Sequence, residues 1–239
     1  MRKRTWWLAG LLAVAVLAVG THMMSKSRCF QLVGDVVCRV ETDRRIVALS
    51  FDDGPTPEGT DAVLATLEEY GVTATFFLIG NRLERFPGQA ERLTAAGHEI
   101  GNHSYSHQRN LFRSRDFYRS EVRDTDALLR EAGIVTDLFR PPFGKRLIGL
   151  PLEVDNAGYR TIMWDVEERP EDFDDPEEFA ADIVSRVEPG SIILMHPMYR
   201  HNDVARAALP LVLQGLAARG YEIVTVGELL AHGESAASQ

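Results

Sequence analysis

Seven short apolar segments alternate with helical segments from residue 46 onward, and this alternation limits the fold of the 239-residue chain more than any other feature. Each apolar segment has the length of a buried strand, and most of the helical segments end at a glycine. Strands joined by helices pair in parallel through right-handed crossovers. Seven such units without an internal break predict a single α/β domain and favour a barrel-like closure over an open sheet. The predicted strands are Ile46–Phe51, Ala74–Ile79, His98–Asn102, Asp137–Arg140, Arg160–Trp164, Ser191–His196 and Tyr221–Val226.

Residues 1–24 have the composition of an export segment. A basic cluster at residues 2–4 precedes an apolar or small run over residues 6–20, which is short for a transmembrane helix. A signal peptide that is cleaved and a membrane anchor over residues 5–24 both agree with this pattern. Either one places the domain in the periplasm, in the extracellular space or on the outer side of the cytoplasmic membrane, because the basic cluster stays inside.

Residues 25–45 are predicted to form a β-hairpin ahead of the domain, since two short apolar runs flank Gly34-Asp35. Cys29 and Cys38 lie on either side of this hairpin, and a cysteine pair in an exported protein favours a disulfide. An ideal two-residue turn leaves the two cysteines diagonal, at about 7–8 Å, so the bond requires a bulge or a shifted turn. The alternative is a pair of buried apolar thiols.

The domain itself is assigned to residues 46–232, and residues 233–239 are expected to form a short polar tail. The chain carries a formal net charge of −9, and beyond residue 45 it has 18 Lys or Arg against 32 Asp or Glu. This acidic balance excludes nucleic acid as an expected partner.

Polar and charged side chains recur where the predicted strands end. The carboxyl ends of the strands meet on one face of a closed α/β barrel, and the active site lies there. We therefore expect these side chains to form one site. They are Asp52 and Asp53 after the first strand, Asn102 to His107 at the third, Arg140 to Gly144 at the fourth, Trp164 and Asp165 at the fifth, and His196 at the sixth.

Asp52 and Asp53 can have separate tasks, because successive side chains of a strand point to opposite sides. One could hold a cation while the other accepts a proton. His103 and His107 are the best metal candidates, since their i, i+4 spacing lets both imidazoles reach one ion if the segment is a helical turn. Two histidines and one aspartate leave a coordination position open for water. The alternative is a pair of solvated loop histidines.

Three further residues are candidates for the same site. His196 ends a buried strand and has the ordinary pKa range for proton transfer near neutrality, although it could be a hydrogen-bonded core histidine. Arg140 would be a buried guanidinium that needs a carboxylate; Asp52 is the natural partner, and a structural salt bridge elsewhere is the alternative. Trp164 could form a wall of a sugar pocket or belong to the core.

These residues, in this order, resemble the NodB-homology polysaccharide deacetylases, carbohydrate esterase family 4, from about residue 46 to residue 231. The resemblance implies a deformed (β/α)7-type barrel that binds a divalent metal. It also implies hydrolysis of acetyl groups on N-acetylated or, less often, O-acetylated polysaccharide. The four matching motifs are Ser50-Phe51-Asp52-Asp53-Gly54-Pro55, His103-Ser104-Tyr105-Ser106-His107, Arg140-Pro141-Pro142-Phe143-Gly144 and Leu194-Met195-His196.

The resemblance also implies a role for each motif residue. Asp52 would be the catalytic base, and Arg140 would orient it. Asp53, His103 and His107 would hold the metal, which is most often zinc, with cobalt or manganese as alternatives.

The remaining roles concern the substrate and the leaving group. The backbone amide of Phe143 would help to form the oxyanion hole, Leu194 would line the acetyl pocket beside Trp164, and His196 would be the general acid. The fourth family motif departs from the usual pattern, with Phe173 where tryptophan is common. Asp172 is the candidate for the acid that tunes His196, and Asp165 is its rival.

The implied partner is an acetylated glycan, which could be peptidoglycan, a chitin-like oligomer or poly-N-acetylglucosamine. One other function is hydrolysis of small amides on the same barrel, but such relatives are typically cytoplasmic, and the export segment counts against it. Another is a non-catalytic glycan-binding module. Such a module would be expected to lose Asp52, a metal ligand or His196, and all of these are present.

Overall fold

In the computed structural model, which describes residues 2–199 and 201–237, nine strands form one sheet, and every pairing between named strands is parallel. The sheet order is β1-β6-β5-β4-β3-β2-β8-β7, and β9 pairs with β2. All seven predicted strands are present, as β2 to β6, β8 and β9, and only β7 was not predicted. The strands are β1 (Val36–Val37), β2 (Ile46–Gly54), β3 (Thr75–Leu78), β4 (Glu99–Asn102), β5 (Leu138–Phe139), β6 (Arg160–Ile162), β7 (Val166–Glu167), β8 (Ile192–Met195) and β9 (Glu222–Val224).

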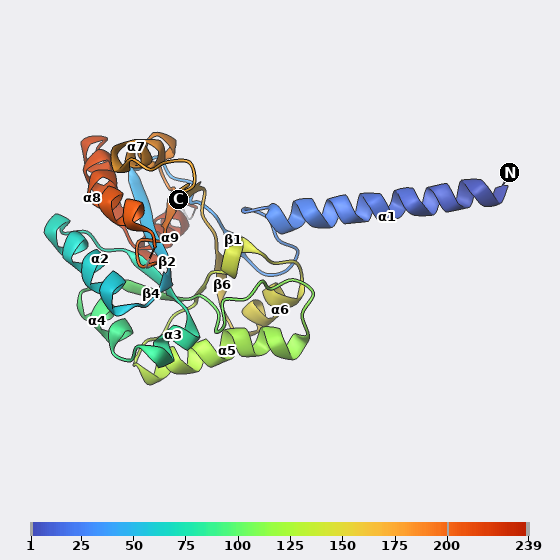
Figure 1. The fold of residues 1–239 in the computed structure, drawn as a ribbon, viewed down its shortest axis with the longest axis horizontal. Coiled ribbons are helices and arrows are strands. Elements are labelled where there is room, and N and C mark those ends of the chain that lie inside the picture. The colour runs from blue at the N-terminus through green and yellow to red at the C-terminus, as the bar shows by residue number, and fades with distance from the viewer. Residues whose placement is uncertain (1, 200, 238–239) are drawn as a thin grey trace.

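The sheet curls into a deformed, incomplete (β/α) barrel with helices on its outer side (Figure 1). One segment explains the closure: β6 pairs with β1 and β5, and a few residues later β7 pairs with β8. This segment therefore joins the two ends of the curled sheet. The helices are α1 (Arg2–Lys26), α2 (Pro57–Tyr70), α3 (Gly80–Arg85), α4 (Gln89–Ala95), α5 (Arg115–Glu131), the 3-10 helix η1 (Pro142–Gly144), α6 (Gly149–Asn156), α7 (Pro176–Arg186), α8 (Asp203–Ala218) and α9 (Val226–Ala237).

Alternation along β2 divides the core into an outer and an inner layer. Val47, Leu49 and Phe51 belong to the cluster that packs under the outer helices. Ile46 and Ala48 belong to a second cluster, to which α9 contributes side chains, so α9 closes the barrel interior near the start of β2. Side chains of β2 with even numbers therefore face the interior.

Helix ends follow local capping chemistry. Thr56 caps α2, with its hydroxyl accepting from the Gly59 amide, and Gly71 ends the helix in the left-handed conformation, at φ 62°. Asp175 caps α7 in the same way, by accepting from the Glu178 amide. These signals fix where the outer helices begin and end, and hence the lengths of the loops that carry the site.

The N-terminal region differs from the predicted hairpin. Residues 30–33 form no strand, and β1 pairs in parallel with β6 instead of folding back on its own neighbour. Cys29 and Cys38 form a disulfide with their Cα atoms 5.2 Å apart, which the diagonal geometry of a regular hairpin would not allow. The exposed edge of β6 therefore determines the conformation of this region, and not the Gly34-Asp35 turn.

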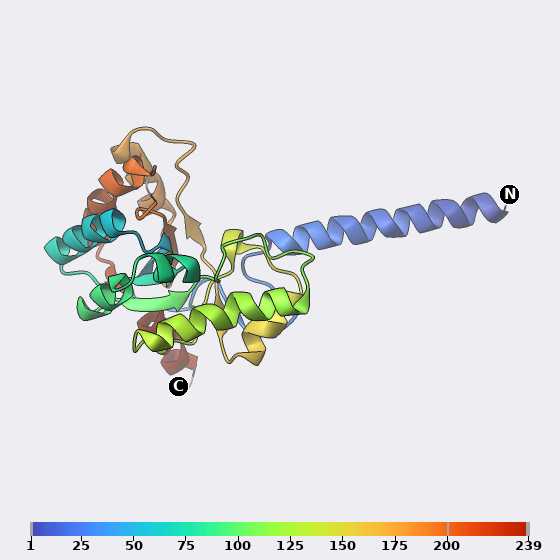
Figure 2. The same ribbon diagram turned by 60° about the horizontal axis from the view of Figure 1, so that its bottom comes forward.

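The described residues begin and end with helices. The N-terminal helix α1 projects away from the barrel (Figure 2). Within residues 2–199 and 201–237, no helix combines the length and the apolar character that a bilayer-spanning segment needs. At the other end α9 runs to Ala237, so the polar tail predicted from residue 233 is wrong as far as residue 237. An ion pair between Glu234 and Arg160, at 3.3 Å, holds this last part of α9 against the domain, and residues 238–239 lie outside the described residues.

Candidate functional site

The end of β2 presents two carboxylates to one place, although strand alternation would separate them. Asp52 continues the inward-facing positions of β2 and is buried. Asp53 would face outward, but its backbone has φ 66°, and the register between β2 and β3 shifts between Phe51 and Gly54. This irregularity turns Asp53 back toward the interior, so both carboxylates reach the same site.

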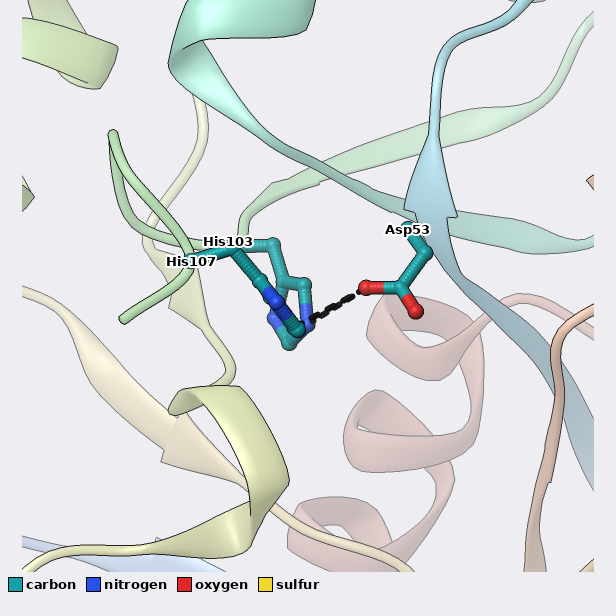
Figure 3. Close-up of side chains that lie close together, drawn as sticks. All are labelled: Asp53, His103 and His107. Carbon is teal, nitrogen blue, oxygen red and sulfur yellow. Dashed lines mark ion pairs between the residues drawn. The ribbon is translucent and has the colours of Figure 1, made fainter. Parts of the chain in front are cut away.

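Asp53, His103 and His107 form a compact group of possible metal ligands. Asp53 Oδ1 lies 2.9 Å from His107 Nε2 and 3.6 Å from His103 Nε2. The ligand atoms of all three residues lie within 4.8 Å of one another. Figure 3 shows both imidazoles directed at the Asp53 carboxylate from the far side of the site. The structure thus brings together the three residues that the sequence suggested as ligands.

The chemistry of these donors fits a divalent cation. His103 Nδ1 lies 2.8 Å from the carbonyl oxygen of Arg140, which can only accept, so Nδ1 carries the proton and Nε2 presents a lone pair. Asp53 Oδ1 is buried and makes no hydrogen bond in the described structure, despite its closeness to His107. Burial by itself raises the pKa of Asp53, but the close polar contacts and the charge of the two histidines outweigh it and lower the pKa. The residues therefore offer an ionised carboxylate and two imidazole nitrogens.

The loop that carries the two histidines is not the helical turn that we expected. Ser104 and His107 have positive φ angles of 65° and 55°, and the Ser104 hydroxyl accepts from the His107 amide. Asn102 Oδ1 accepts from the Ser104 amide at 2.9 Å. The buried Glu121 of α5 accepts from both the amide and the hydroxyl of Ser106. Sequence reasoning placed Asn102 at the site without its role in the loop, and it missed Glu121, because only the fold brings α5 to this loop.

Arg140 contacts Asp52, as the sequence suggested. Its Nη1 donates to Asp52 Oδ1 at 2.8 Å, and its side chain is fully buried. The other guanidinium nitrogens donate to the carbonyl oxygens of Ile162 and Met163, and the group lies 3.9 Å from the centre of the Phe77 ring. Burial lowers the pKa of Arg140, and the Asp52 carboxylate opposes this shift. The pair keeps Asp52 in a fixed orientation beside the ligand group.

His196 is positioned by a carboxylate that the sequence analysis did not select. Its Nδ1 lies 3.0 Å from Glu168 Oε1, and the same oxygen accepts from Asn202 Nδ2 at 2.9 Å. Burial lowers the pKa of His196, but the hydrogen bond to Glu168 and the negative charges of Asp52, Glu168 and Asp53 raise it to about 9. His196 is therefore protonated near neutrality and lies within electrostatic range of both aspartates.

The structure does not place Asp172 beside His196, so this predicted contact is wrong. Asp172 is exposed and pairs with Arg169, at 3.6 Å. Asp165, the rival candidate, accepts hydrogen bonds from Ser191 and from the amide of Ile192. Glu168 lies beside His196 instead. It directly follows β7, and its amide donates to the carbonyl oxygen of Leu194 in β8. Predicting strand β7 would have pointed to Glu168, which directly follows it.

The three predicted substrate contacts lie at different depths. Phe143 is 52% exposed, has φ 57°, and places its ring 4.8 Å from that of His107, so it stands at the mouth of the site. Leu194 and Trp164 are buried in the inner cluster. The indole Nε1 of Trp164 has no hydrogen-bond partner among the described residues.

Comparison with known proteins identifies the family. Residues 39–162 match the family model described as polysaccharide deacetylase. A peptidoglycan-N-acetylglucosamine deacetylase of Bacillus cereus is 34% identical over 199 residues, which span 82% of this chain and 93% of the relative. The peptidoglycan-N-acetylmuramic acid deacetylase PdaC of Bacillus subtilis is 31% identical over 194 residues, which span 80% of this chain and 40% of that protein.

Solved structures agree with the sequence relatives. A peptidoglycan N-acetylglucosamine deacetylase in complex with an N-oxidanyl-benzamide has a TM-score of 0.77 at 29% identity, over 81% of this chain and 92% of that one. A family 4 carbohydrate esterase from Streptomyces lividans, in complex with acetate, has a TM-score of 0.68 at 29% identity, over 79% and 93% of the two chains. A pseudoenzyme of the same family from Bacillus anthracis has a TM-score of 0.76 at 27% identity, over 83% and 70%. With its parallel curled sheet and its group of candidate ligands, this chain belongs to the polysaccharide deacetylases of carbohydrate esterase family 4.

Proposed function

We propose that this protein is a zinc-dependent deacetylase that acts outside the cytoplasm on N-acetylated glycan of the peptidoglycan type. The observation that carries the proposal is the separate pairing of the two carboxylates at the end of β2. Asp52 pairs with a buried guanidinium, and Asp53 lies against two imidazoles. One carboxylate is thus available as a base and the other as a ligand.

The side chains around this pair suit hydrolysis of an amide. Zinc bound by one carboxylate and two imidazoles supplies Lewis-acid polarisation of an acetyl carbonyl and acidifies water. Asp52, held by Arg140, accepts the proton of the attacking water. The backbone amide of Phe143 would donate to the developing oxyanion. His196, protonated near neutrality, gives its proton to the leaving nitrogen, which departs poorly without one.

The residues argue for catalysis more strongly than the fold does, because a pseudoenzyme has a similar fold. A glycan-binding module has no use for a base, an acid and a ligand group held at one place. In this chain Asp52 has its arginine, His196 has its carboxylate, and the ligand group is present. This complete set favours a deacetylase over a binding module.

The substrate and the compartment follow from two further observations. The relatives that match most of this chain include deacetylases named for peptidoglycan N-acetylglucosamine. The disulfide between Cys29 and Cys38 suits an oxidising compartment, in agreement with an export segment at residues 1–24. Peptidoglycan is therefore preferred over chitin-like oligomers and poly-N-acetylglucosamine, and O-acetylated xylan is the least favoured.

Acetate release from a panel of these four glycans tests the proposal. We expect the highest kcat/KM with peptidoglycan fragments, and little release from acetylated xylan. Asp52→Asn should abolish release while zinc stays bound, whereas Asp53→Ala should lose the zinc, as measured by elemental analysis. No release from any glycan by the zinc-loaded protein would refute the activity. Xylan as the best substrate would refute the preference for amides, and full activity in Asp52→Asn would refute the base.

A further inference from the structure

A cavity lies beside Phe143, on the side of this residue away from the candidate metal group. It has a volume of about 300 Å³, and it lies between the loop that follows Phe143 and the segment that follows α1. The ring of Phe143 lines this cavity and also lies 4.8 Å from the ring of His107. A single side chain therefore separates the cavity from a candidate metal ligand. The lining residues are Ser25, Lys26, Arg28, Phe143, Gly144, Lys145, Met163, Trp164 and Glu167.

The segment that forms the outer wall of the cavity, residues 25–31, is called the N-terminal strap below. The buried guanidinium of Arg146 fixes the strap to the domain, because it donates to neutral oxygens of the strap and of Gly144. The Cys29–Cys38 disulfide ties the same segment to the region of β1. Hydrogen bonds and a disulfide thus hold the strap in a defined place in the fold. The acceptors of Arg146 are the carbonyl oxygens of Ser27, Arg28, Phe30 and Gly144, at 3.1–3.3 Å, and Gln31 Oε1, at 2.9 Å.

The charge of the cavity wall is positive, although the chain as a whole carries a formal charge of −9. Of the charged residues in the wall, Arg28 pairs with Glu167 at 2.5 Å, which leaves Lys26 and Lys145. Neither lysine has an acidic partner among the described residues; Lys145 Nζ contacts only the carbonyl oxygen of Ser25, at 3.4 Å. Lysine occurs only three times in the sequence, at positions 3, 26 and 145, so two of the three line this cavity.

Lys145 carries its charge in an unfavourable place. Burial lowers the pKa of Lys145, and the nearby positive charges of Lys26 and Arg109 lower it further. Trp164 lines the same cavity. A bound anion would relieve the repulsion between the lysines and would be partly shielded from water, where charge-assisted contacts are strong.

We infer that this cavity is a subsite for an anionic substituent of the glycan, a carboxylate or a phosphate, carried close to the acetamido group that reaches the metal site. The inference rests on the proposed function for the identity of the ligand as a glycan. It adds that the strap, which lies outside the catalytic motifs, selects charged over neutral N-acetylated glycans. Lys26 and Lys145 would bind the anion. Arg146 would hold the strap in place without contacting the anion.

Binding can be measured without catalysis by NMR of 13C-dimethylated lysines, since methylation keeps the charge. The full chain carrying Asp52→Asn gives one dimethyl-lysine signal for each lysine. The variants Lys26→Arg and Lys145→Arg assign two of these signals, and Lys3 is the internal reference. The probes are a neutral N-acetylglucosamine tetramer, a tetrasaccharide of N-acetylglucosamine and N-acetylmuramic acid, and N-acetylglucosamine 6-phosphate. We expect the signals of Lys26 and Lys145, and not that of Lys3, to move with one or both anionic probes; the responding probe identifies carboxylate or phosphate. No movement, or equal movement with the neutral tetramer, overturns the subsite.

Kinetics give an independent measurement. The double variant Lys26→Gln/Lys145→Gln should lower the ratio of kcat/KM for the anionic over the neutral glycan by about tenfold, as expected for two partly exposed charge contacts. Arg123→Gln, which removes an exposed cation of α5 away from the cavity, is the matched control and should leave the ratio unchanged. An unchanged ratio in the double variant overturns the inference while leaving the proposed deacetylase activity intact. If the unmodified protein releases no acetate, only the proposed function is refuted, because the NMR signals report binding and not catalysis.

Discussion

Replacing Glu168 by glutamine tests how the pKa of His196, the proposed general acid, is set. Glu168 Oε1 lies 3.0 Å from His196 Nδ1, and the pKa of His196 is about 9 instead of its ordinary 6.5. The amide keeps the size of the side chain and can still accept a hydrogen bond, but it removes the charge. A carboxylate at this distance shifts a neighbouring pKa by about 1–3 units, so we expect the pKa of His196 to fall by about 1–2 units.

The sign of the effect on activity follows from the role of the acid. As the proposed general acid, His196 would donate a proton, so it would be competent below its pKa, and activity would be lost as pH rises through that pKa. At pH 8 a histidine with a pKa of about 9 is roughly 90% protonated, whereas one at about 7–8 is roughly 10–50% protonated. We therefore expect Glu168→Gln to move the alkaline limb of the kcat/KM profile to lower pH. At pH 8 kcat/KM should fall about two- to tenfold.

The assay is a pH profile of kcat/KM for acetate release, measured from pH 6 to 10 with zinc-loaded protein. Asp172→Asn is the matched control, because Asp172 is an exposed aspartate of the same segment that contacts Arg169 and not His196. It should leave the alkaline limb in place. The reasoning is refuted if the Glu168→Gln limb coincides with that of the unmodified protein, or if Asp172→Asn moves the limb instead.

Two further predictions concern stability. Arg140→Met leaves the Asp52 carboxylate buried without its partner, so the free energy of unfolding should fall by about 3–5 kcal/mol in urea denaturation; a fall below about 1 kcal/mol would show that water or another group satisfies Asp52. Replacing both Cys29 and Cys38 by serine removes a link across nine positions of sequence and should lower the free energy of unfolding by roughly 2–3 kcal/mol in the same assay, whereas unchanged stability would indicate that the strap is held without the bond.

The sequence allowed the fold class and much of the site to be predicted. The predicted strands are all present. Short apolar runs bounded by helix caps and glycines are local signals, and the folded domain buries these runs as strands. The placement of polar residues at strand ends correctly indicated that Asp52 and Arg140 would meet, and that His103 and His107 would lie near Asp53. These contacts follow from topology, since the carboxyl ends of parallel strands share one edge.

Other features depend on contacts that no local pattern encodes. Glu168 reaches His196 only because β7 pairs with β8, a strand that lies well beyond it in the sequence. The N-terminal strap lies beside Phe143 because Arg146 binds its carbonyl oxygens and the disulfide ties it to the region of β1. A strand of two residues, such as β7, and a set of backbone acceptors around one arginine leave almost no signature in composition or periodicity.

The acidic pair at the end of β2 shows the division most clearly. The sequence alone determined that Asp52 and Asp53 would stand at the end of a buried strand and that they would need partners, because the cost of burying a charge is a local property. It also indicated opposite directions for the two side chains. The tertiary structure decided otherwise: pairing with β3 shifts the register, and the backbone of Asp53 adopts φ 66°. Pairing with β3 holds Asp53 in that conformation, and this turns two neighbouring carboxylates toward one site.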